Sequence, residues 1–404
     1  MKEVWPQNHS DVCIRCATCM AICPVSRVTP LFPGPKQAGP GAQRFRKPDE
    51  PSVDEWINLC IGCQLCDTVC AAGVNISELN LIAKAKYLDE KGRPLRDWLL
   101  THTHLFGSMA SFFAPIVNFL LRNPAVKWLL DNVLKIDRRR ELPSYESPTF
   151  RKWFRGHRSQ GQRKIAYFYG CFTNTNEVDV GKATVEVLEA NGYQVTLPPQ
   201  ECCGIAMLGI GDFKGARKMG LKNVPSLLNA ARSGMDILFS STSCGHMIKH
   251  EYSHLLNISG SEELAPHLFD LFEFLGNLKE EGKLNTHFKP LPLKAAYFAP
   301  CHLRSLGIAF PALEILRLIP GLSIENVEAN CCGLGGMFGF KKEKYYISEE
   351  IGRDLAEAIN RMSPEIVLSD CEGCRMQIRH LTGLKVLHPL QLLRDALPQP
   401  IAHP

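Results

Sequence analysis

The chain has 404 residues, of which 45% are hydrophobic and 22% are charged, which is the composition of a globular protein with a sizeable core. The net charge of +5 is small for this length, so charge gives no reason to expect a nucleic-acid partner, and we predict none. The 17 cysteines are unusual, and an odd number cannot all pair as disulfides. The segment MKEVWPQNHS has no apolar core of a secretion signal, so we expect a reducing compartment, in which cysteines serve as thiols or metal ligands.

Residues 1–95 are predicted to form a small domain that metal clusters stabilise. This part has little periodic pattern and contains a turn-rich segment, PLFPGPKQAGPGAQ, at residues 30–43. Apolar residues at a spacing near 3.6 predict a helix within residues 75–95. The cysteines of this domain are therefore expected to supply much of its cohesion.

Two cysteine runs in this domain have the ferredoxin spacing. They are Cys13-x2-Cys16-x2-Cys19-x3-Cys23-Pro24 and Cys60-x2-Cys63-x2-Cys66-x3-Cys70. In bacterial ferredoxins the fourth cysteine of each run binds the other cluster. We therefore predict two [4Fe–4S] clusters, one held by Cys13, Cys16, Cys19 and Cys70, the other by Cys60, Cys63, Cys66 and Cys23. Structural zinc, which also binds Cys-x2-Cys pairs, is the alternative.

Residues 96–160 are a connector with an apolar part followed by a basic part. No charged residue occurs from Leu105 to Leu121, and Pro115 interrupts this stretch. A second apolar group and then a run of arginines and lysines follow, at residues 128–134 and 138–158. An apolar surface with cationic edges is typical of a membrane interface. A helical hairpin packed on the protein's own core or on a partner subunit is the alternative.

Two histidines, His102 and His104, immediately precede the apolar stretch. Either one is a candidate proton carrier for a quinone site, although histidines at a surface or a helix cap are more common. The chain has no G-x-G-x-x-G after a strand, no P-loop and no H-E-x-x-H. We therefore expect no flavin or nicotinamide site and no oxidation of an organic substrate by this chain alone.

From residue 161 onward the pattern becomes α/β and occurs twice, in residues 161–288 and 289–404. Strands are expected within 164–171, 193–197, 236–244, 293–301 and 365–374, and helices within 177–192 and 312–321. Corresponding cysteines of the two copies are 130, 129 and 127 positions apart, which indicates an internal repeat. The predicted fold class is α+β multidomain, with a helical, ferredoxin-like two-cluster domain followed by two repeated α/β domains that have parallel sheets.

Each repeat contains a Cys-Cys-Gly motif and further cysteines at strand ends, where α/β folds place ligands. The first repeat offers Cys171, Cys202, Cys203 and Cys244, and the second offers Cys301, Cys331, Cys332, Cys371 and Cys374. Aligning Cys244 with Cys371 places Met247 opposite Cys374. We predict a metal site in each repeat, with buried inert cysteines as the alternative. The spacing leaves open a cubane cluster, a non-cubane cluster or another metal. His302, beside Cys301, is expected to support the neighbouring cysteine ligands or the fold and not to act in catalysis.

The twin ferredoxin runs followed by two Cys-Cys-Gly repeats resemble the CCG-domain family of iron–sulfur subunits. This family serves glycolate oxidase, heterodisulfide reductase and anaerobic glycerol-3-phosphate dehydrogenase. Longer segments, the last of which lie outside the general cysteine motifs, are most similar to the iron–sulfur subunit of the last of these. Those segments are residues 23–40, 113–118, 135–145, 149–155, 289–302 and 338–345.

This resemblance implies an electron-transfer subunit, non-catalytic or quinone-reducing, of a membrane-associated respiratory dehydrogenase. A separate flavin-containing subunit would oxidise sn-glycerol 3-phosphate. This chain, peripheral on the cytoplasmic face of the inner membrane, would pass electrons toward a quinone such as menaquinone. The resemblance also implies a [4Fe–4S] cluster, non-cubane in related proteins, on the five cysteines of the second repeat. The alternatives are the iron–sulfur subunit of a glycolate or lactate oxidase and a disulfide-reductase-like subunit.

Overall fold

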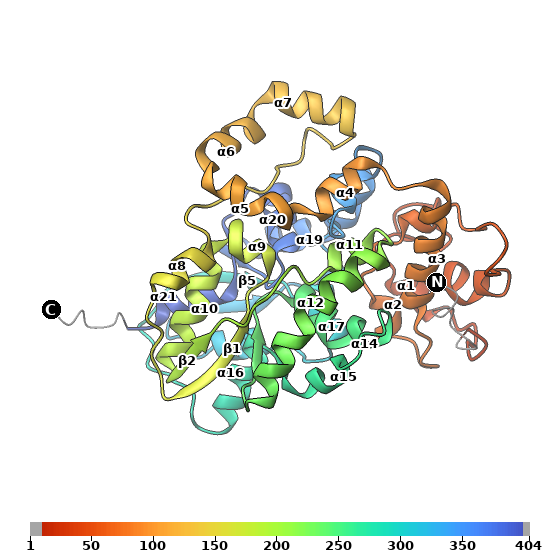
Figure 1. The fold of residues 1–404 in the computed structure, drawn as a ribbon. Helices are drawn as coiled ribbons and strands as arrows, with labels where there is room; N and C mark the ends of the chain where they lie inside the picture. Colours follow the sequence, from red (N-terminus) through yellow and green to blue (C-terminus); the bar gives the residue numbers. More distant parts are fainter. Residues whose placement is uncertain (1–9, 399–404) are drawn as a thin grey trace.

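The computed structural model describes residues 10–398 and places the two repeats side by side, with the N-terminal domain against them (Figure 1). The N-terminal domain is built from short turns around one long helix, α3 (Ile76–Lys91), which confirms the helix predicted there. Its other elements are α1 (Thr18–Ile22), η2 (Gln37–Gly41), η3 (Ile57–Leu59) and α2 (Leu65–Thr68). Together with the two parallel sheets of the repeats, described next, this domain confirms the predicted α+β multidomain fold class.

The first repeat contains a four-stranded parallel sheet in the order β2-β1-β3-β4. Its strands are β1 (Arg163–Phe168), β2 (Tyr193–Thr196), β3 (Ile237–Phe239) and β4 (Leu268–Asp270). Its helices are α9 (Gly170–Thr175), α10 (Val178–Ala190), α11 (Ile205–Gly209), α12 (Phe213–Arg232), α13 (Thr242–His246), η5 (Met247–Glu251), α14 (Tyr252–His254), α15 (Ser261–Leu264), η6 (Ala265–His267) and α16 (Leu271–Glu280).

The second repeat has the same topology, β6-β5-β7-β8, again all parallel. Its strands are β5 (Lys294–Tyr297), β6 (Ser323–Asn326), β7 (Ile366–Leu368) and β8 (Val386–Leu387). Its helices are α17 (Cys301–Ser305), α18 (Pro311–Leu316), η7 (Phe338–Phe340), η8 (Lys342–Lys344), α19 (Tyr345–Met362), α20 (Glu372–Thr382) and α21 (Pro389–Ala396). The observed α18 is shorter than the helix predicted at 312–321.

A shared hydrophobic core joins the two repeats. Alternate residues of each strand face opposite sides, because side chains in a strand alternate with a period of two. Ile165 and Tyr167 of β1 and Ala295 and Tyr297 of β5 all belong to one buried cluster. Helices α10, α16, α18 and α21 contribute the other side of this cluster, and α10 packs on α21. The repeats are therefore fixed relative to each other by burial of apolar surface.

The connector contains the helices α4 (Leu95–Thr101), α5 (Thr103–Phe112), α6 (Ala114–Arg122), α7 (Pro124–Leu129), η4 (Leu130–Leu134) and α8 (Phe150–Gly156). Helices α6 and α7 project from the body of the molecule (Figure 1). The chain bends by 111° between α5 and α6, where Pro115 lies in the first turn of α6. This break agrees with the interruption predicted at Pro115, since proline fits the start of a helix but not its interior.

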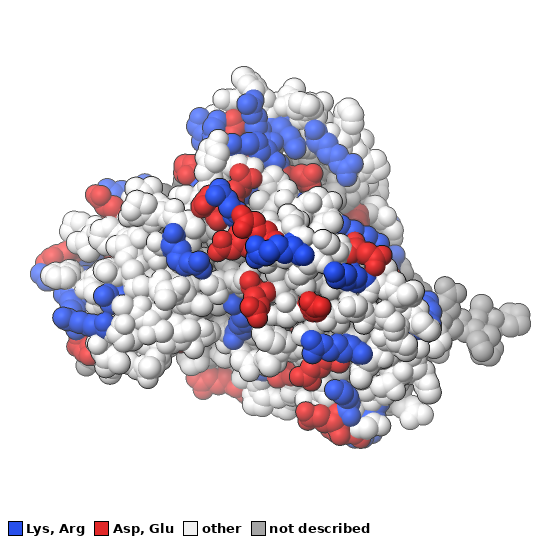
Figure 2. All heavy atoms as spheres, turned by 180° about the vertical axis from the view of Figure 1, so that it is seen from behind, with Lys and Arg blue, Asp and Glu red and all other residues white. Residues whose placement is uncertain are grey.

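Helices α6 and α7, together with the adjoining α5 and η4, form the projecting helices, which expose an unusual amount of apolar surface. Their large exposed side chains are Leu105, Met109, Phe112, Phe113, Ile116, Phe119, Leu120, Trp128, Leu129 and Val133. Seen from behind, Lys and Arg side chains gather beside uncharged surface at this end of the molecule (Figure 2). Within residues 10–398 no single helix is long and apolar enough to cross a membrane, although α5 and α6 meet the criteria of length and composition as a bent pair.

Candidate iron–sulfur sites

The two ferredoxin-type loops share an uncommon backbone conformation. Arg15 and Ala17 flank Cys16 with φ of 59° and 65°, and Gly62 and Gln64 flank Cys63 with φ of 67° and 62°. Left-handed conformations are costly for residues with a side chain, so they persist where the surroundings require them. Such turns direct successive N–H groups into a concave surface that suits an anionic centre such as an iron–sulfur cluster. The backbone of both loops therefore fits a cluster.

The first set of thiols comes from both runs, as the predicted grouping requires. Burial raises the pKa of the Cys19 thiol, and the neighbouring Cys13, Cys70 and Cys16 raise it further. Cys16 is exposed and accepts a hydrogen bond from the Thr18 hydroxyl at 3.4 Å, which lowers the pKa of the Cys16 thiol. This set lies at the outer side of the N-terminal domain.

The second set also combines the runs and lies deeper in the molecule. Burial raises the pKa of Cys63 well above its usual value, and Cys301, Cys23 and Cys60 add to this effect. Burial likewise raises the pKa of Cys66, with smaller contributions from its neighbours. Cys23 and Cys60 share a hydrophobic cluster with Cys331 of the second repeat. This second set therefore directly adjoins the Cys-Cys-Gly site of the second repeat.

The cysteines of the repeats follow three neighbouring strands of each sheet. The chain leaves β1 and β3 toward opposite faces of the first sheet. Helix α10, which follows β1, packs in the core on one face, and η5, which follows β3, packs in the core on the other face. Parallel sheets bind ligands at such a switch point, outside the carboxyl ends of the strands. Cys171 follows β1, Cys244 follows β3, and the pair Cys202-Cys203 follows β2. The second repeat uses β5, β7 and β6 in the same way.

Thiols approach one another closely in both repeats. The sulfurs of Cys171 and Cys202 are 3.8 Å apart, and those of Cys332 and Cys374 are 3.3 Å apart. Burial raises the pKa of Cys301 to about 12, with Cys332 and Cys371 adding to the effect. Thiolates this buried are costly without a cation, so the donor chemistry fits a cluster of iron and sulfide. No group of three or more His, Cys, Asp or Glu side chains within residues 10–398 is arranged to hold one metal ion.

The glycine of each Cys-Cys-Gly motif has a positive φ, +89° at Gly204 and +91° at Gly333. Its N–H points back to the sulfur of the first cysteine of the pair, at 3.4 Å from Gly204 to Cys202 and 3.3 Å from Gly333 to Cys331. A Cβ at Gly204 would lie 3.0 Å from the Cα of Ala216. Only glycine combines this backbone conformation with so close an approach.

The structure corrects the predicted alignment of the last cysteines. Tyr167 pairs with Leu238 in the first sheet and Tyr297 pairs with Leu368 in the second, which is a constant offset of 130 positions. With this offset Cys244 corresponds to Cys374, and Ser241 corresponds to Cys371. Both Ser241 and Cys371 are the residue immediately before a helix, α13 or α20. Met247 is therefore not the replacement for the fifth cysteine. The sequence alignment was wrong because it paired the first cysteine after β3, Cys244, with the first cysteine after β7, Cys371.

A cluster of histidines lies where the three domains meet, and the sequence did not predict it. The rings of His246 and His302 are stacked with centroids 5.2 Å apart. His302 hydrogen-bonds Ser243 at 3.0 Å, and His246 hydrogen-bonds Glu251 at 3.1 Å. Gln64 of the N-terminal domain donates to the same Glu251 oxygen at 2.5 Å. The only sequence signal is the spacing of four between His246, His250 and His254, which places them on one face of a helix.

The two quinone-site candidates differ in their surroundings. The Nδ1 of His102 bonds the carbonyl oxygen of Trp98 at 3.0 Å, and its ring stacks on the Trp98 ring. His104 instead has a buried Nδ1 without a partner in the described residues. Burial lowers the pKa of His104, whereas the nearby Cys202 opposes this shift. His104, in the first turn of the apolar helix α5, therefore lies near the thiols of the first repeat.

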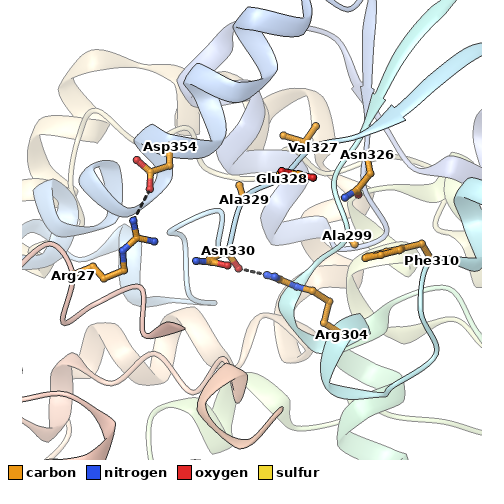
Figure 3. Close-up of a pocket in the computed structure, with 10 residues that line it drawn as sticks. All are labelled: Arg27, Ala299, Arg304, Phe310, Asn326, Val327, Glu328, Ala329, Asn330 and Asp354. Carbon is orange, nitrogen blue, oxygen red and sulfur yellow. Dashed lines mark hydrogen bonds and ion pairs between the residues drawn. The ribbon is translucent and has the colours of Figure 1, made fainter. Parts of the chain in front are cut away.

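A cavity of about 340 Å³ lies between the N-terminal domain and the second repeat (Figure 3). Arg27 reaches it from the N-terminal domain and pairs with Asp354 of α19 at 3.4 Å. Arg304 donates to the carbonyl of Asn330, the residue before Cys331, and its Nε has no partner within the described residues. No cysteine lines this cavity. The cavity therefore lies beside the Cys-Cys-Gly site of the second repeat and does not enclose its thiols.

Comparison with known protein families identifies the domains. The cysteine-rich domain family, CCG, matches residues 165–249 and 295–379, again 130 positions apart. The 4Fe-4S dicluster domain family matches residues 9–74. These matches confirm the two [4Fe–4S] clusters of the N-terminal domain and the two CCG repeats. The assignment of individual cysteines as ligands stays a prediction.

Similar proteins extend over almost the whole chain. The C subunit of anaerobic glycerol-3-phosphate dehydrogenase from Escherichia coli (strain K12) is 40% identical, over 95% of this chain and 98% of its own. The B subunit of fumarate reductase (CoM/CoB) from Methanothermobacter marburgensis is 27% identical, over 97% of this chain and 74% of its own. Lactate utilization protein A of Bacillus subtilis (strain 168) is 29% identical, over 57% of this chain and 99% of its own. By the extent and level of the first similarity, the chain belongs to the family of the anaerobic glycerol-3-phosphate dehydrogenase C subunit.

Proposed function

We propose that the chain is the electron-transfer subunit of a membrane-associated glycerol-3-phosphate dehydrogenase. It accepts electrons from a separate flavin-containing subunit that oxidises sn-glycerol 3-phosphate, and it delivers them to a quinone such as menaquinone. Thiolate-bound iron–sulfur clusters supply one-electron exchange over a wide range of potentials. The relative that is 40% identical bears the name of such a dehydrogenase, which supports this substrate over a glycolate or lactate oxidase.

One observation carries the proposal: the four sets of thiols form a continuous series through the molecule. Cys19 of the first set and Cys66 of the second share a hydrophobic cluster. Cys63 of the second set is an electrostatic neighbour of Cys301 in the second repeat. Ser243, beside Cys244 of the first repeat, lies 3.9 Å from the sulfur of Cys371 in the second.

The series ends at the projecting helices. Burial raises the pKa of Tyr145, and its proximity to Cys171 of the first repeat adds to this effect. Tyr145 exchanges two backbone hydrogen bonds of 2.8 Å with the side chain of Asn118 in α6. Helix α5 packs on α9, which begins beside Cys171. The opposite end of the series is the exposed Cys16, so we place the contact with the flavin subunit there and the quinone beside His104.

We further propose that the projecting helices bind the cytoplasmic face of the inner membrane peripherally. The exposed apolar side chains of α5, α6, α7 and η4 face solvent in the isolated chain, which is costly unless a partner covers them. Exposed Arg122, Lys135 and Arg138 at their edges suit anionic headgroups. An apolar face with cationic margins is typical of helices that lie in the plane of an interface.

The variant Cys63→Ala, assembled with its partner subunits, tests the electron-transfer role. Loss of this thiol should abolish quinone reduction, while substrate should still reduce the flavin of the partner. The exposed Cys16 provides a second variant, Cys16→Ala, that should act in the same way through the other N-terminal cluster. Unchanged quinone turnover in both variants would contradict the proposal.

A further inference from the structure

The two repeats differ at one position that precedes a helix in each. The observed register places Ser241 of the first repeat where the second repeat has Cys371. The other thiols correspond: Cys171 with Cys301, the pair Cys202-Cys203 with Cys331-Cys332, and Cys244 with Cys374. Ser241 is therefore the residue by which the first site has four thiols instead of five.

The side chain of Ser241 is engaged by the protein. Its Oγ accepts a hydrogen bond from the N–H of Cys244 at 3.4 Å, which caps α13. It also lies 3.1 and 3.3 Å from the two carboxylate oxygens of Glu372 in the second repeat, and it donates its proton there. Both hydrogen-bonding roles of this hydroxyl are thus used within the chain.

The side chain of Cys371 is not engaged in this way. It makes no capping hydrogen bond to α20, and its sulfur lies 3.9 Å from the hydroxyl of Ser243. The Cys371 side chain lies among the other thiols of its repeat, since it packs against the buried cluster that contains Cys332 and Cys374. Cys371 is therefore free to bind metal, whereas its counterpart Ser241 serves the fold.

We infer that Ser241 sets the cluster type of the first CCG site. Four thiolates give each iron of a cubane [4Fe–4S] cluster one protein ligand, whereas the second site offers one thiolate more than a cubane needs. The two sites therefore hold different clusters, and exchange of Ser241 with Cys371 exchanges their types. The inference rests on the proposed function insofar as both CCG sites carry clusters.

The test compares four forms of the full-length protein, purified without oxygen after growth on ⁵⁷Fe. They are the wild type, Ser241→Cys, Cys371→Ser and the double exchange Ser241→Cys/Cys371→Ser. Mössbauer and EPR spectra report cluster type, and iron and acid-labile sulfide are counted in each form. The spectral component due to a five-thiolate site should correspond to one cluster in the wild type and to two clusters in Ser241→Cys. It should be absent from Cys371→Ser and should again correspond to one cluster in the double exchange.

Three outcomes would overturn the inference. A Ser241→Cys protein with full iron content and an unchanged spectrum would show that a fifth thiol at this position is ineffective. Persistence of the component in Cys371→Ser would show that Cys371 does not define it. The control Ser241→Ala should keep the wild-type spectrum, so a changed cluster type with full iron content in this control would show that the hydroxyl, and not the missing thiol, sets the cluster type. By contrast, a wild type with iron for only the two N-terminal clusters would contradict the proposed function itself.

Discussion

The imidazole rings of His246 in the first repeat and His302 in the second are stacked, with an angle of 12° between their planes. The stack is held from both sides. His246 bonds the buried Glu251, and His302 bonds Ser243. Because Glu251 also accepts from Gln64, one carboxylate joins the cluster-binding loop of the N-terminal domain to the first repeat, and the stacked rings continue this link to the second repeat. These buried polar contacts thus add to the shared apolar core in holding the thiol sites of the three domains in place.

Replacement of Glu251 by alanine should loosen this junction. His246 and Gln64 would each lose a buried hydrogen-bond partner, and leaving such a group unsatisfied costs about 1–3 kcal/mol. The midpoint of unfolding in urea, followed by circular dichroism under argon, should fall. Glu251→Gln keeps one acceptor oxygen and should fall less. Equal stability of the wild type and Glu251→Ala would argue against a structural role for the junction.

Acid should destabilise the protein through His250. Burial lowers the pKa of His250 to about 4, with the adjacent His246 contributing. The unfolded chain takes up this proton below about pH 6.5, but the folded chain does so only near pH 4. Stability that is complete above pH 6.5 should therefore decline progressively as the pH falls toward 4.

The matching variant, His250→Gln, should lose less stability than the wild type between pH 7 and 5. His254, exposed one turn further along, provides the control His254→Gln, which should behave as the wild type does. Unfolding midpoints at several pH values give the comparison. If the unfolding midpoints of all three proteins fall equally as the pH is lowered, His250 is not the cause of the acid destabilisation.

Removal of apolar side chains from the projecting helices should weaken membrane binding. Phe112, Phe119 and Trp128 are 71%, 69% and 56% exposed. Burial of one large apolar side chain is worth about 1.5–3 kcal/mol, so the triple serine variant should bind at least about tenfold more weakly. Flotation with anionic liposomes measures this. Leu221, exposed on α12, gives the control Leu221→Ser, which should bind as the wild type does. Undiminished flotation of the triple variant would identify the helices as a protein-contact surface.

His104→Gln should impair quinone reduction in the assembled dehydrogenase more than His102→Gln does. The Nδ1 of His104 is buried without a partner among the described residues beside the first repeat, whereas His102 is bonded to Trp98. Steady-state turnover with a menaquinone analogue should fall about tenfold or more, in line with loss of a proton-transfer group. Reduction of the chain by dithionite, followed by its visible spectrum, should be unaffected. A larger effect at His102 would move the quinone site toward Trp98.

The sequence predicted those features that depend on local spacing. The ferredoxin runs and the strands that end at cysteines are encoded within short segments, and the structure has strands at each predicted place. Short strands such as β4, β6 and β8 were not predicted, because two to four residues carry little periodicity. The equivalence of Ser241 with Cys371 depends on strand register, which becomes apparent only when Leu238 and Leu368 are seen at the same position.

The junction of the three domains was also beyond local reasoning. His302 and Gly62 are 240 positions apart, and Gln64 and Glu251 are 187 apart, so no window of sequence contains both partners. The histidines of η5 and α14 resemble those of any amphipathic segment until the second repeat is packed against them. Contacts of this kind follow from tertiary packing alone.

The placement of cysteines at strand ends has a consequence for biosynthesis. During translation the thiols predicted to bind both N-terminal clusters have emerged once Cys70 has left the ribosome, so these sites can be filled early. The second CCG site waits for Cys374, long after its first thiol, Cys301, has been made. Its cysteines come from three strands that must pair before they converge, and metal binding is coupled to that folding. Iron delivery to this protein is thus expected to proceed in two stages, the second of which depends on the completed second sheet.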